Sequence, residues 1–273
     1  MGRGGVLLCA LHCAWKHYEV STVETWKWKP RRIASDFEFK YRFWVIAAIF
    51  WVGFSLYAID HKNSGHMLAQ SLAHLRRATN STLEHRLVFA AAALIAVLAS
   101  TIRTWGTAYL RPEVMVSMRL QTSRLVVDGP YRFVRNPLYL GNIMIAVAMG
   151  LMASRLGLAV LVIGNTLFVY RLILREEAEL EATRGDSYRA YCAAVPRLLP
   201  ALWPRVSAAG GVPDFWAGLL GELFFWTFTA SLVVFAATLN QTLYYWVLGS
   251  AFLVYALSLV AIKRRGKRTG MAA

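Results

Sequence analysis

The chain has 273 residues, of which 57% are hydrophobic and 16% are charged, and its formal net charge is +15. A soluble domain has about a quarter of its residues charged, so this composition argues against a soluble protein. The basic residues lie between long apolar runs and form no separate basic domain, which argues against a nucleic-acid-binding protein and favours an integral membrane protein.

Residues 1–42 are predicted to form a tail in the cytoplasm or at the membrane interface. Its apolar piece, residues 6–15, is shorter than the roughly 20 residues that a membrane-spanning helix needs. No convincing cleavage site follows this piece, so we expect no signal peptide. We also expect no metal site, because no second ligand pair at zinc-finger spacing accompanies Cys9, His12, Cys13 and His17.

Residues 43–104 are predicted to hold two transmembrane helices and a connecting segment. The helices are expected at 43–59 and 87–101, with a possible extension of the second helix to residue 109. In the connecting segment, residues 61–86, apolar side chains recur at helical spacing, which predicts a helix lying along the membrane interface. They are Met67, Leu68, Leu72 and Leu75.

Four more transmembrane helices are expected in the rest of the chain. Residues 138–153 and 156–174 are separated by a short turn and are predicted to form an antiparallel helical hairpin. Residues 215–238 and 242–262 are expected to form a second hairpin, followed by a basic tail. The predicted fold is therefore an all-α integral membrane protein with about six transmembrane helices.

Most of the 30 Lys and Arg residues lie in the termini and in two polar segments, 102–137 and 175–214. The positive-inside rule places these segments and both termini in the cytoplasm, which predicts a multi-pass protein. Each segment adjoins one end of the central hairpin, so the two loops are expected to meet on one face. A short β-like run is expected at residues 124–127.

We divide the chain into a tail (1–42), two helices with their connection (43–104), a catalytic core (105–203) and a C-terminal hairpin with its tail (204–273).

The first polar segment ends in the sequence DGPYRFVRNPLYLGN at residues 128–142. Its Asp-Gly-Pro start is turn chemistry, and Pro137 suits the first position of a helix because that position needs no N–H donor. The amides after Pro137 carry the positive end of the helix dipole, with Arg132 and Arg135 beside them. This terminus suits a carboxylate or a phosphate. The alternative is a juxtamembrane loop whose arginines only fix the topology.

The second polar segment begins with an acidic run, and Glu176 and Glu177 come directly after the fourth predicted span. The simplest interpretation is an amphipathic helix with a solvated acidic face. Against it, paired carboxylates opposite a basic helix N-terminus make a site with separated charge. A zwitterionic cofactor such as S-adenosylmethionine suits that site, whereas no glycine-rich fingerprint of a Rossmann domain follows a strand.

At this point the residues resemble a known family. Arg135-Asn136-Pro137-Leu138-Tyr139-Leu140-Gly141 resembles the Arg-His-Pro-x-Tyr-x-Gly element of the isoprenylcysteine carboxyl methyltransferase and phospholipid methyltransferase superfamily. The lead-in Gly129-Pro130-Tyr131-Arg132 also matches. A C-terminal element matches in order and spacing through Glu176, Glu177, Leu180, Gly185, Tyr188, Tyr191 and Val195-Pro196-Arg197. The resemblance covers residues 105–203.

The resemblance implies an integral-membrane methyltransferase whose cofactor site is formed by the two cytoplasmic loops around the central hairpin. The residues that it places around S-adenosylmethionine are Tyr131, Arg135, Asn136, Pro137, Tyr139, Gly141, Glu176 and Glu177. It makes Glu177, Arg197 and Tyr188 the candidate catalytic residues, the last two for holding a substrate carboxylate. The chain departs from the family pattern at two positions. Asn136 replaces the usual histidine, and Arg184 replaces an aromatic residue before Gly185.

The function that we expect is methyl transfer from S-adenosylmethionine to a carboxylate or amine of a lipophilic or lipidated acceptor in the membrane lipid. Two alternatives stay open at this point. Membrane sterol reductases that use NADPH resemble the same C-terminal pattern, including Tyr191-Cys192, although they are larger. A non-catalytic scaffold or a small transporter is the other alternative, but transporters usually show repeats or broken helices, and neither is evident here.

Overall fold

The computed structural model describes residues 33–110 and 126–270, and these residues form helices and turns without any strand. The chain divides at Ile33, and everything below concerns the unit that begins at Ala34. Most of the tail 1–42, including its Cys and His residues, therefore lies outside the described residues. So does the first half of the predicted β-like run. Its second half, Val126 and Val127, is not in a strand, so that prediction is wrong there.

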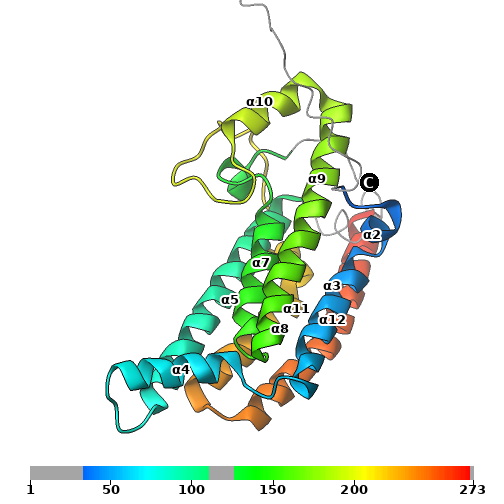
Figure 1. The fold of residues 1–273 in the computed structure, drawn as a ribbon. Helices are drawn as coiled ribbons and strands as arrows, with labels where there is room; N and C mark the ends of the chain where they lie inside the picture. Colours follow the sequence, from blue (N-terminus) through cyan, green and yellow to red (C-terminus); the bar gives the residue numbers. More distant parts are fainter. Residues whose placement is uncertain (1–32, 111–125, 271–273) are drawn as a thin grey trace, which may run out of the picture. The chain divides into compact units, whose positions relative to one another are not determined.

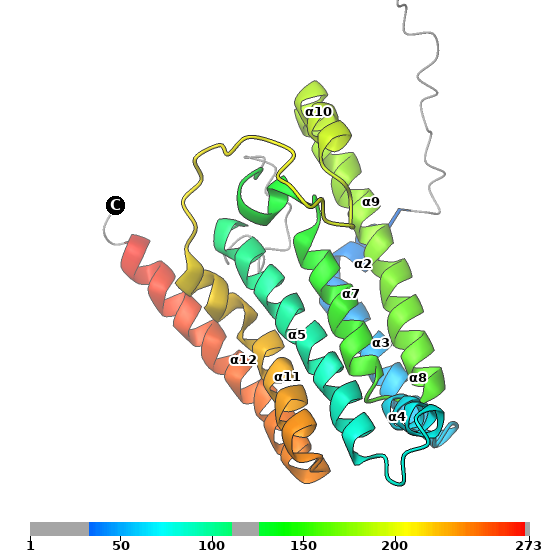
Figure 2. The same ribbon diagram turned by 90° about the vertical axis from the view of Figure 1, so that its left-hand side faces the viewer.

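Each of the six apolar segments predicted from the sequence forms a helix (Figures 1 and 2). The elements in chain order are α2 (Asp36–Lys40), α3 (Arg42–Ser55), η2 (Leu56–Ala58), α4 (Ser64–Leu75), α5 (Thr82–Leu110), η3 (Gly129–Arg132), α7 (Pro137–Gly150), α8 (Arg155–Ala159), η4 (Val160–Gly164), α9 (Asn165–Arg184), α10 (Asp186–Ala194), α11 (Phe215–Thr238) and α12 (Gln241–Gly270). The predicted helix in the connecting segment is α4.

Three of the described helical stretches are long and apolar enough to cross a membrane. They are Thr82–Leu110, Arg155–Arg184 and Phe215–Thr238. Two shorter apolar helices, Arg42–Ala58 and Pro137–Gly150, accompany them. The structure is therefore that of a helical membrane protein, and a total of six spans stays a prediction.

Two helices continue well into the segments predicted to be loops. The helix expected at 87–101 runs on to Leu110, in line with the possible extension to residue 109. The helix expected at 156–174 runs on to Arg184 and therefore carries the acidic run. A helix satisfies its own backbone hydrogen bonds, so it does not need to end where its side chains become polar.

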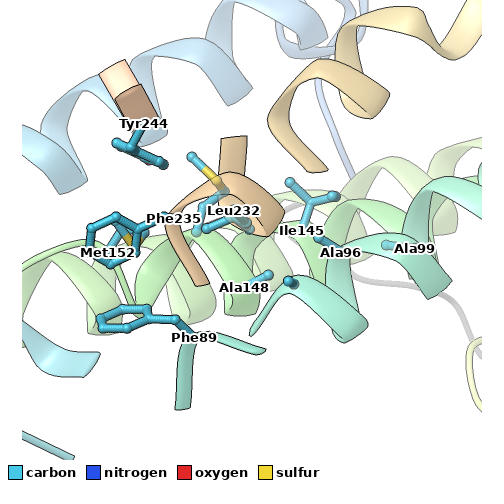
Figure 3. Close-up of a cluster of buried hydrophobic side chains, with 11 residues drawn as sticks. Phe89, Ala96, Ala99, Ile145, Ala148, Met152, Leu232, Phe235 and Tyr244 are labelled. Atoms are coloured by element: carbon cyan, nitrogen blue, oxygen red, sulfur yellow. The ribbon is translucent and has the colours of Figure 1, made fainter. Parts of the chain in front are cut away.

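The bundle is built around α5, which lies between α7 and α11 in Figure 2. Small side chains on α5 allow close packing: Ala96 and Ala99 are fully buried, and a Cβ on Gly218 of α11 would lie 2.8 Å from the carbonyl oxygen of Thr104. Larger apolar side chains from α5, α7 and α11, with Tyr244 of α12, fill the core beside this seam (Figure 3).

The predicted central hairpin consists of α7 and the continuous stretch from α8 to α9. Ser154 caps α8 by accepting a hydrogen bond from the backbone N–H of Gly157. Next to it, Arg155 forms an ion pair with Asp60, which follows α3, with a distance of 2.9 Å. The turn of this hairpin lies near α4, whereas its two outer ends lie with η3 and α10 at the other end of the bundle (Figures 1 and 2). This agrees with the prediction that the two polar loops share one face.

Candidate functional site

The first loop is folded onto the segment that follows α10. The two oxygens of Asp128 accept backbone hydrogen bonds from Ala209 and Gly211, with distances of 2.6 and 2.8 Å. Gly129 has a φ of +58°, and a side chain there would overlap the ring of Tyr109. The Asp-Gly turn identified in the sequence therefore fixes the start of this loop.

Backbone hydrogen bonds continue this pairing towards α7. The N–H of Arg205 donates to the carbonyl of Arg132 (2.8 Å), and the N–H of Ala201 donates to the carbonyl of Phe133 (2.9 Å). The N–H of Arg135 donates in turn to the carbonyl of Pro196 (2.9 Å). The two loops are thus joined along most of residues 128–136, and this brings the two sequence motifs together.

Glu177 is the centre of the charged site. Its side chain is 11% exposed, and its Oε1 lies 3.1 Å from Nε of Arg135. Its Oε2 accepts hydrogen bonds from Nε of Arg197 at 2.9 Å and forms an ion pair with Nη2 at 2.7 Å. Arg135 also donates to the carbonyl of Cys192 (2.7 Å), which ties α10 to the same cluster.

Asn136, the residue that replaces the family histidine, takes part in this cluster. Its Nδ2 donates to Oε1 of Glu177 (3.3 Å) and to the carbonyl of Arg197 (3.2 Å). It occupies the N-cap position of α7, but its side chain caps no amide of that helix. Pro137 follows at the first helical position, as the sequence predicts. An amide side chain can donate to a carboxylate and carries no titratable group, so Asn136 itself does not change charge with pH.

The second acidic residue, Glu176, makes a separate contact. Its Oε1 accepts a hydrogen bond of 2.6 Å from the hydroxyl of Tyr139 on α7. No donor among the described residues is bonded to its Oε2. The two adjacent glutamates therefore differ, because Glu177 is saturated by basic side chains and Glu176 keeps one oxygen available.

Tyr131 lies buried under the first loop. Its carbonyl accepts a hydrogen bond from the hydroxyl of Tyr191 (2.8 Å). Its own hydroxyl is buried and has no hydrogen-bond partner among the described residues. Burial, together with neighbouring groups that include Glu176 and Glu222, raises the pKa of Tyr131 well above its usual value. The hydroxyl thus stays protonated and is an unused donor near the glutamates.

Tyr188 and Tyr191 lie on one face of α10, as their spacing predicts, and pack with Val195 in an apolar cluster. Burial raises the pKa of both hydroxyls, and burial also raises the pKa of the Cys192 thiol. Tyr188 is buried beside Cys192 and stands in this cluster rather than in the ion-pair network. Its predicted role in holding a substrate carboxylate stays a prediction.

Arg197 is held from two sides. Besides the contacts to Glu177, its Nη1 donates to the hydroxyl of Tyr170 on α9 at 2.7 Å, and its guanidinium lies over the Tyr170 ring. Burial acts to lower the pKa of Arg197, but the hydrogen bond and charge of Glu177 outweigh it and raise the pKa. The arginine is therefore a fixed cation at the edge of the site.

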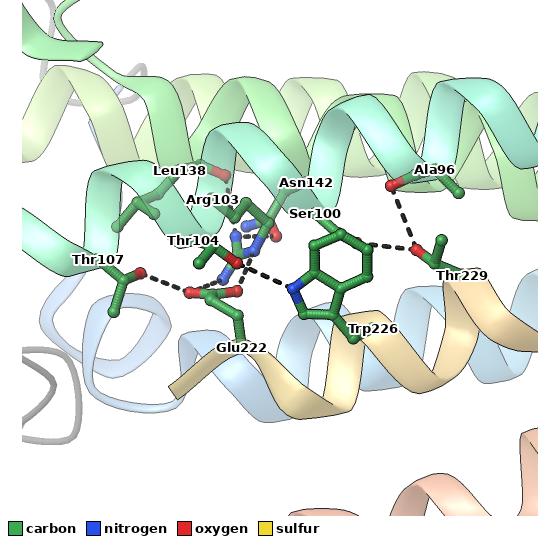
Figure 4. Close-up of polar contacts among 10 residues, drawn as sticks. All are labelled: Ala96, Ser100, Arg103, Thr104, Thr107, Leu138, Asn142, Glu222, Trp226 and Thr229. Carbon is green, nitrogen blue, oxygen red and sulfur yellow. Dashed lines mark hydrogen bonds and ion pairs between the residues drawn. The ribbon is translucent and has the colours of Figure 1, made fainter. Parts of the chain in front are cut away.

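Gly141 does not face this cluster. It is buried against α5, where a Cβ would overlap the side chain of Arg103. Arg103 in turn pairs with Glu222 of α11 inside the bundle (Figure 4). The sequence analysis missed this ion pair. The feature that could have indicated it is a charged residue in each of two apolar helical stretches.

No group of three or more His, Cys, Asp or Glu side chains able to hold a metal ion occurs in the parts of the chain that the structure describes. The site is thus built from arginines, glutamates, tyrosines and one asparagine.

Comparison with known proteins agrees with the resemblance seen in the sequence. The family model described as the isoprenylcysteine carboxyl methyltransferase family matches residues 85–182. This stretch contains most of α5, the first loop, α7 and most of α9, including both glutamates. It ends before Tyr188 and Arg197, and it does not include α11. No curated protein and no solved structure gives a significant match to the chain.

Proposed function

We propose that this protein, whose residues 85–182 match the isoprenylcysteine carboxyl methyltransferase family model, transfers a methyl group from S-adenosylmethionine to a lipophilic acceptor in the membrane. One observation carries the proposal. Arg135 and Asn136 from the first motif and Arg197 from the second converge on Glu177. Charged groups from separate loops that meet at one end of a helical bundle suit the binding of a charged small molecule.

The donors and acceptors around this cluster fit the cofactor. Oε2 of Glu176 suits an ammonium or a hydroxyl group, and the buried Tyr131 hydroxyl suits an acceptor oxygen. The first amides of α7 lack a side-chain cap and carry the positive end of the helix dipole, which suits a carboxylate. These three groups match an amino acid moiety with ribose hydroxyls nearby.

When bound, S-adenosylmethionine supplies a methyl group that is already activated by its sulfonium. The chain therefore mainly has to orient the two reactants and exclude water. A carboxylate acceptor is ionised at neutral pH and needs no base, and Arg197 would orient it. An amine acceptor would have to be in its neutral form before the transfer, because a protonated amine has no lone pair to attack the methyl group.

The surface of η4 and α9 suits a lipophilic acceptor. Ile163 of η4 and Leu167 and Tyr170 of α9 are spaced four and three residues apart and are exposed. Tyr170 is bonded to Arg197, so this apolar face leads to the cation at the edge of the site. An acceptor with an apolar chain and an acidic head would place the chain along α9 and the head at Arg197.

A titration of the purified protein with S-adenosylmethionine in detergent tests the proposal. We expect saturable binding that NADPH does not displace, followed by transfer of a labelled methyl group to components of a lipid extract. Binding of NADPH in place of S-adenosylmethionine would favour the reductase alternative. Binding of neither molecule would leave the scaffold alternative.

A further inference from the structure

Arg103 and Glu222 form an ion pair inside the bundle, apart from the Glu177 cluster (Figure 4). Nε of Arg103 lies 2.6 Å from Oε2 of Glu222, and the two side chains are 5% and 0% exposed. The hydroxyl of Thr107 donates to Oε1 of Glu222 at 2.6 Å. Charged side chains within membrane-spanning stretches are costly and occur mostly where they have a function.

The guanidinium of Arg103 also reaches a third helix. Its Nη1 donates to the carbonyl of Leu138 at 2.9 Å and to Oδ1 of Asn142 at 2.7 Å, both on α7. The stem of Arg103 passes Gly141, where any side chain would block it. An arginine of α5 whose charge is balanced by α11 therefore holds the first turns of α7.

These first turns of α7 carry side chains of the candidate site. Asn136 precedes the helix and donates to Glu177, and Tyr139 donates to Glu176. Both contacts depend on the position of the helix start relative to α9. The contacts of Arg103 lie within one turn of Tyr139 and bind the helix from the opposite side.

We propose that Arg103 and Glu222 are a positioning pair, which fixes the start of α7 so that Asn136 and Tyr139 meet the two glutamates. Glu222 lies outside the segment that matches the family model, so the C-terminal hairpin supplies a part that this segment needs. The expected effect of this pair on cofactor binding rests on the proposed function, whereas its expected effect on the position of α7 is independent of that function.

The test compares two double variants with the wild type. Arg103→Met with Glu222→Leu replaces the pair by apolar residues of similar volume, a change that often keeps or raises stability. Ser100→Ala with Thr229→Val is the matched control, because this hydrogen bond of 2.8 Å joins the same two helices without contacting α7. Amide hydrogen exchange of α7, thermal stability and affinity for S-adenosylmethionine are measured for each.

We expect the Arg103→Met and Glu222→Leu variant to keep its Tm, to exchange faster in the first turns of α7, and to bind the cofactor about tenfold more weakly. The control should match the wild type in all three. Unchanged exchange and affinity in the first variant would overturn the inference.

If that variant does not fold, Asn142→Leu, which leaves the ion pair intact, must show faster exchange in α7. Wild-type protein that binds no S-adenosylmethionine would contradict the proposed function, while the exchange result would still decide the inference.

Discussion

Two adjacent glutamates of α9 have different partners in this protein. Glu177 forms ion pairs with Arg135 and Arg197 and accepts a hydrogen bond from Asn136, whereas Glu176 accepts a hydrogen bond only from Tyr139 among the described residues. A carboxylate that is already paired with two arginines mainly stabilises the loops. A carboxylate with a free oxygen is available for a ligand. The roles of the two residues should therefore separate by mutation.

We expect Glu176→Gln to weaken binding of S-adenosylmethionine about tenfold while leaving the Tm unchanged, because the amide oxygen still accepts the hydrogen bond from Tyr139. Glu177→Gln should instead lower the free energy of unfolding by about 3 kcal/mol, because it leaves two arginines without a counter-ion. Calorimetry and thermal denaturation in detergent measure the two effects. Glu181→Gln, at an exposed position, is the control. Equal effects of the first two variants would contradict this division.

Tyr170 should act on the acceptor and not on the cofactor. Tyr170→Phe keeps the ring on the exposed face of α9 but removes the hydroxyl that accepts a hydrogen bond from Arg197. We expect the KM for a lipophilic acid to rise about tenfold, with the affinity for S-adenosylmethionine unchanged. Steady-state kinetics with the acceptor varied would show this. A change in the affinity for S-adenosylmethionine alone, with the KM for the acceptor unchanged, would contradict this role of Tyr170.

At the scale of helices, the contact between α5 and α11 depends on a glycine. A Cβ on Gly218 would lie 2.8 Å from the Thr104 carbonyl and 3.0 Å from the Ala108 backbone nitrogen, and backbone atoms cannot move aside easily. We expect Gly218→Ala to destabilise the protein by about 1–3 kcal/mol. Gly249→Ala on α12, where nothing lies within 4 Å of the added Cβ, is the matched control. A Tm for Gly218→Ala at or above that of the control would contradict the packing.

The connection between α3 and α8 should make stability depend on acid pH. The hydrogen bonds from Arg155 to Asp60 lower the pKa of that carboxyl to about 2. Because the pKa of Asp is near 3.9 in an unfolded chain, this stabilisation is present above about pH 4 and is lost as the pH falls towards 2. The Tm of Asp60→Asn should therefore fall less than that of the wild type between these values. Parallel Tm curves for the two proteins would rule this contribution out.

For the whole molecule, the positive-inside rule and the fold together predict which loops are accessible from each side. The two site loops lie at one end of the bundle, and the turn after α11 lies at the other (Figure 2). In a chain without its native cysteines, Asn240→Cys should react with an impermeant thiol reagent in intact cells. Ala208→Cys should react only after the membrane is opened. The reverse pattern would invert the predicted orientation, and labelling of both positions in intact cells would contradict a spanning topology.

The sequence predicted the positions of the apolar helices and the meeting of the two motifs, because both depend on local hydropathy and on short connections. It left the ends of α5 and α9 open, because the polar residues after positions 101 and 174 fit either a continued helix or a loop in a local window. The sequence shows a charged residue in each of two apolar stretches, but it does not show that Arg103 pairs with Glu222, because the two residues are more than a hundred positions apart. Likewise, only the packed structure places Gly141 against α5 and Tyr188 in an apolar cluster.

The central claim is that the loops around Glu177 bind S-adenosylmethionine, and ultraviolet cross-linking with the methyl-labelled cofactor tests it most directly. We predict label in peptides that cover residues 131–141 and 170–197, with less label after Glu176→Gln. Excess unlabelled S-adenosylmethionine should remove the label. Label confined to other peptides, or no label that the unlabelled cofactor can displace, would contradict the claim.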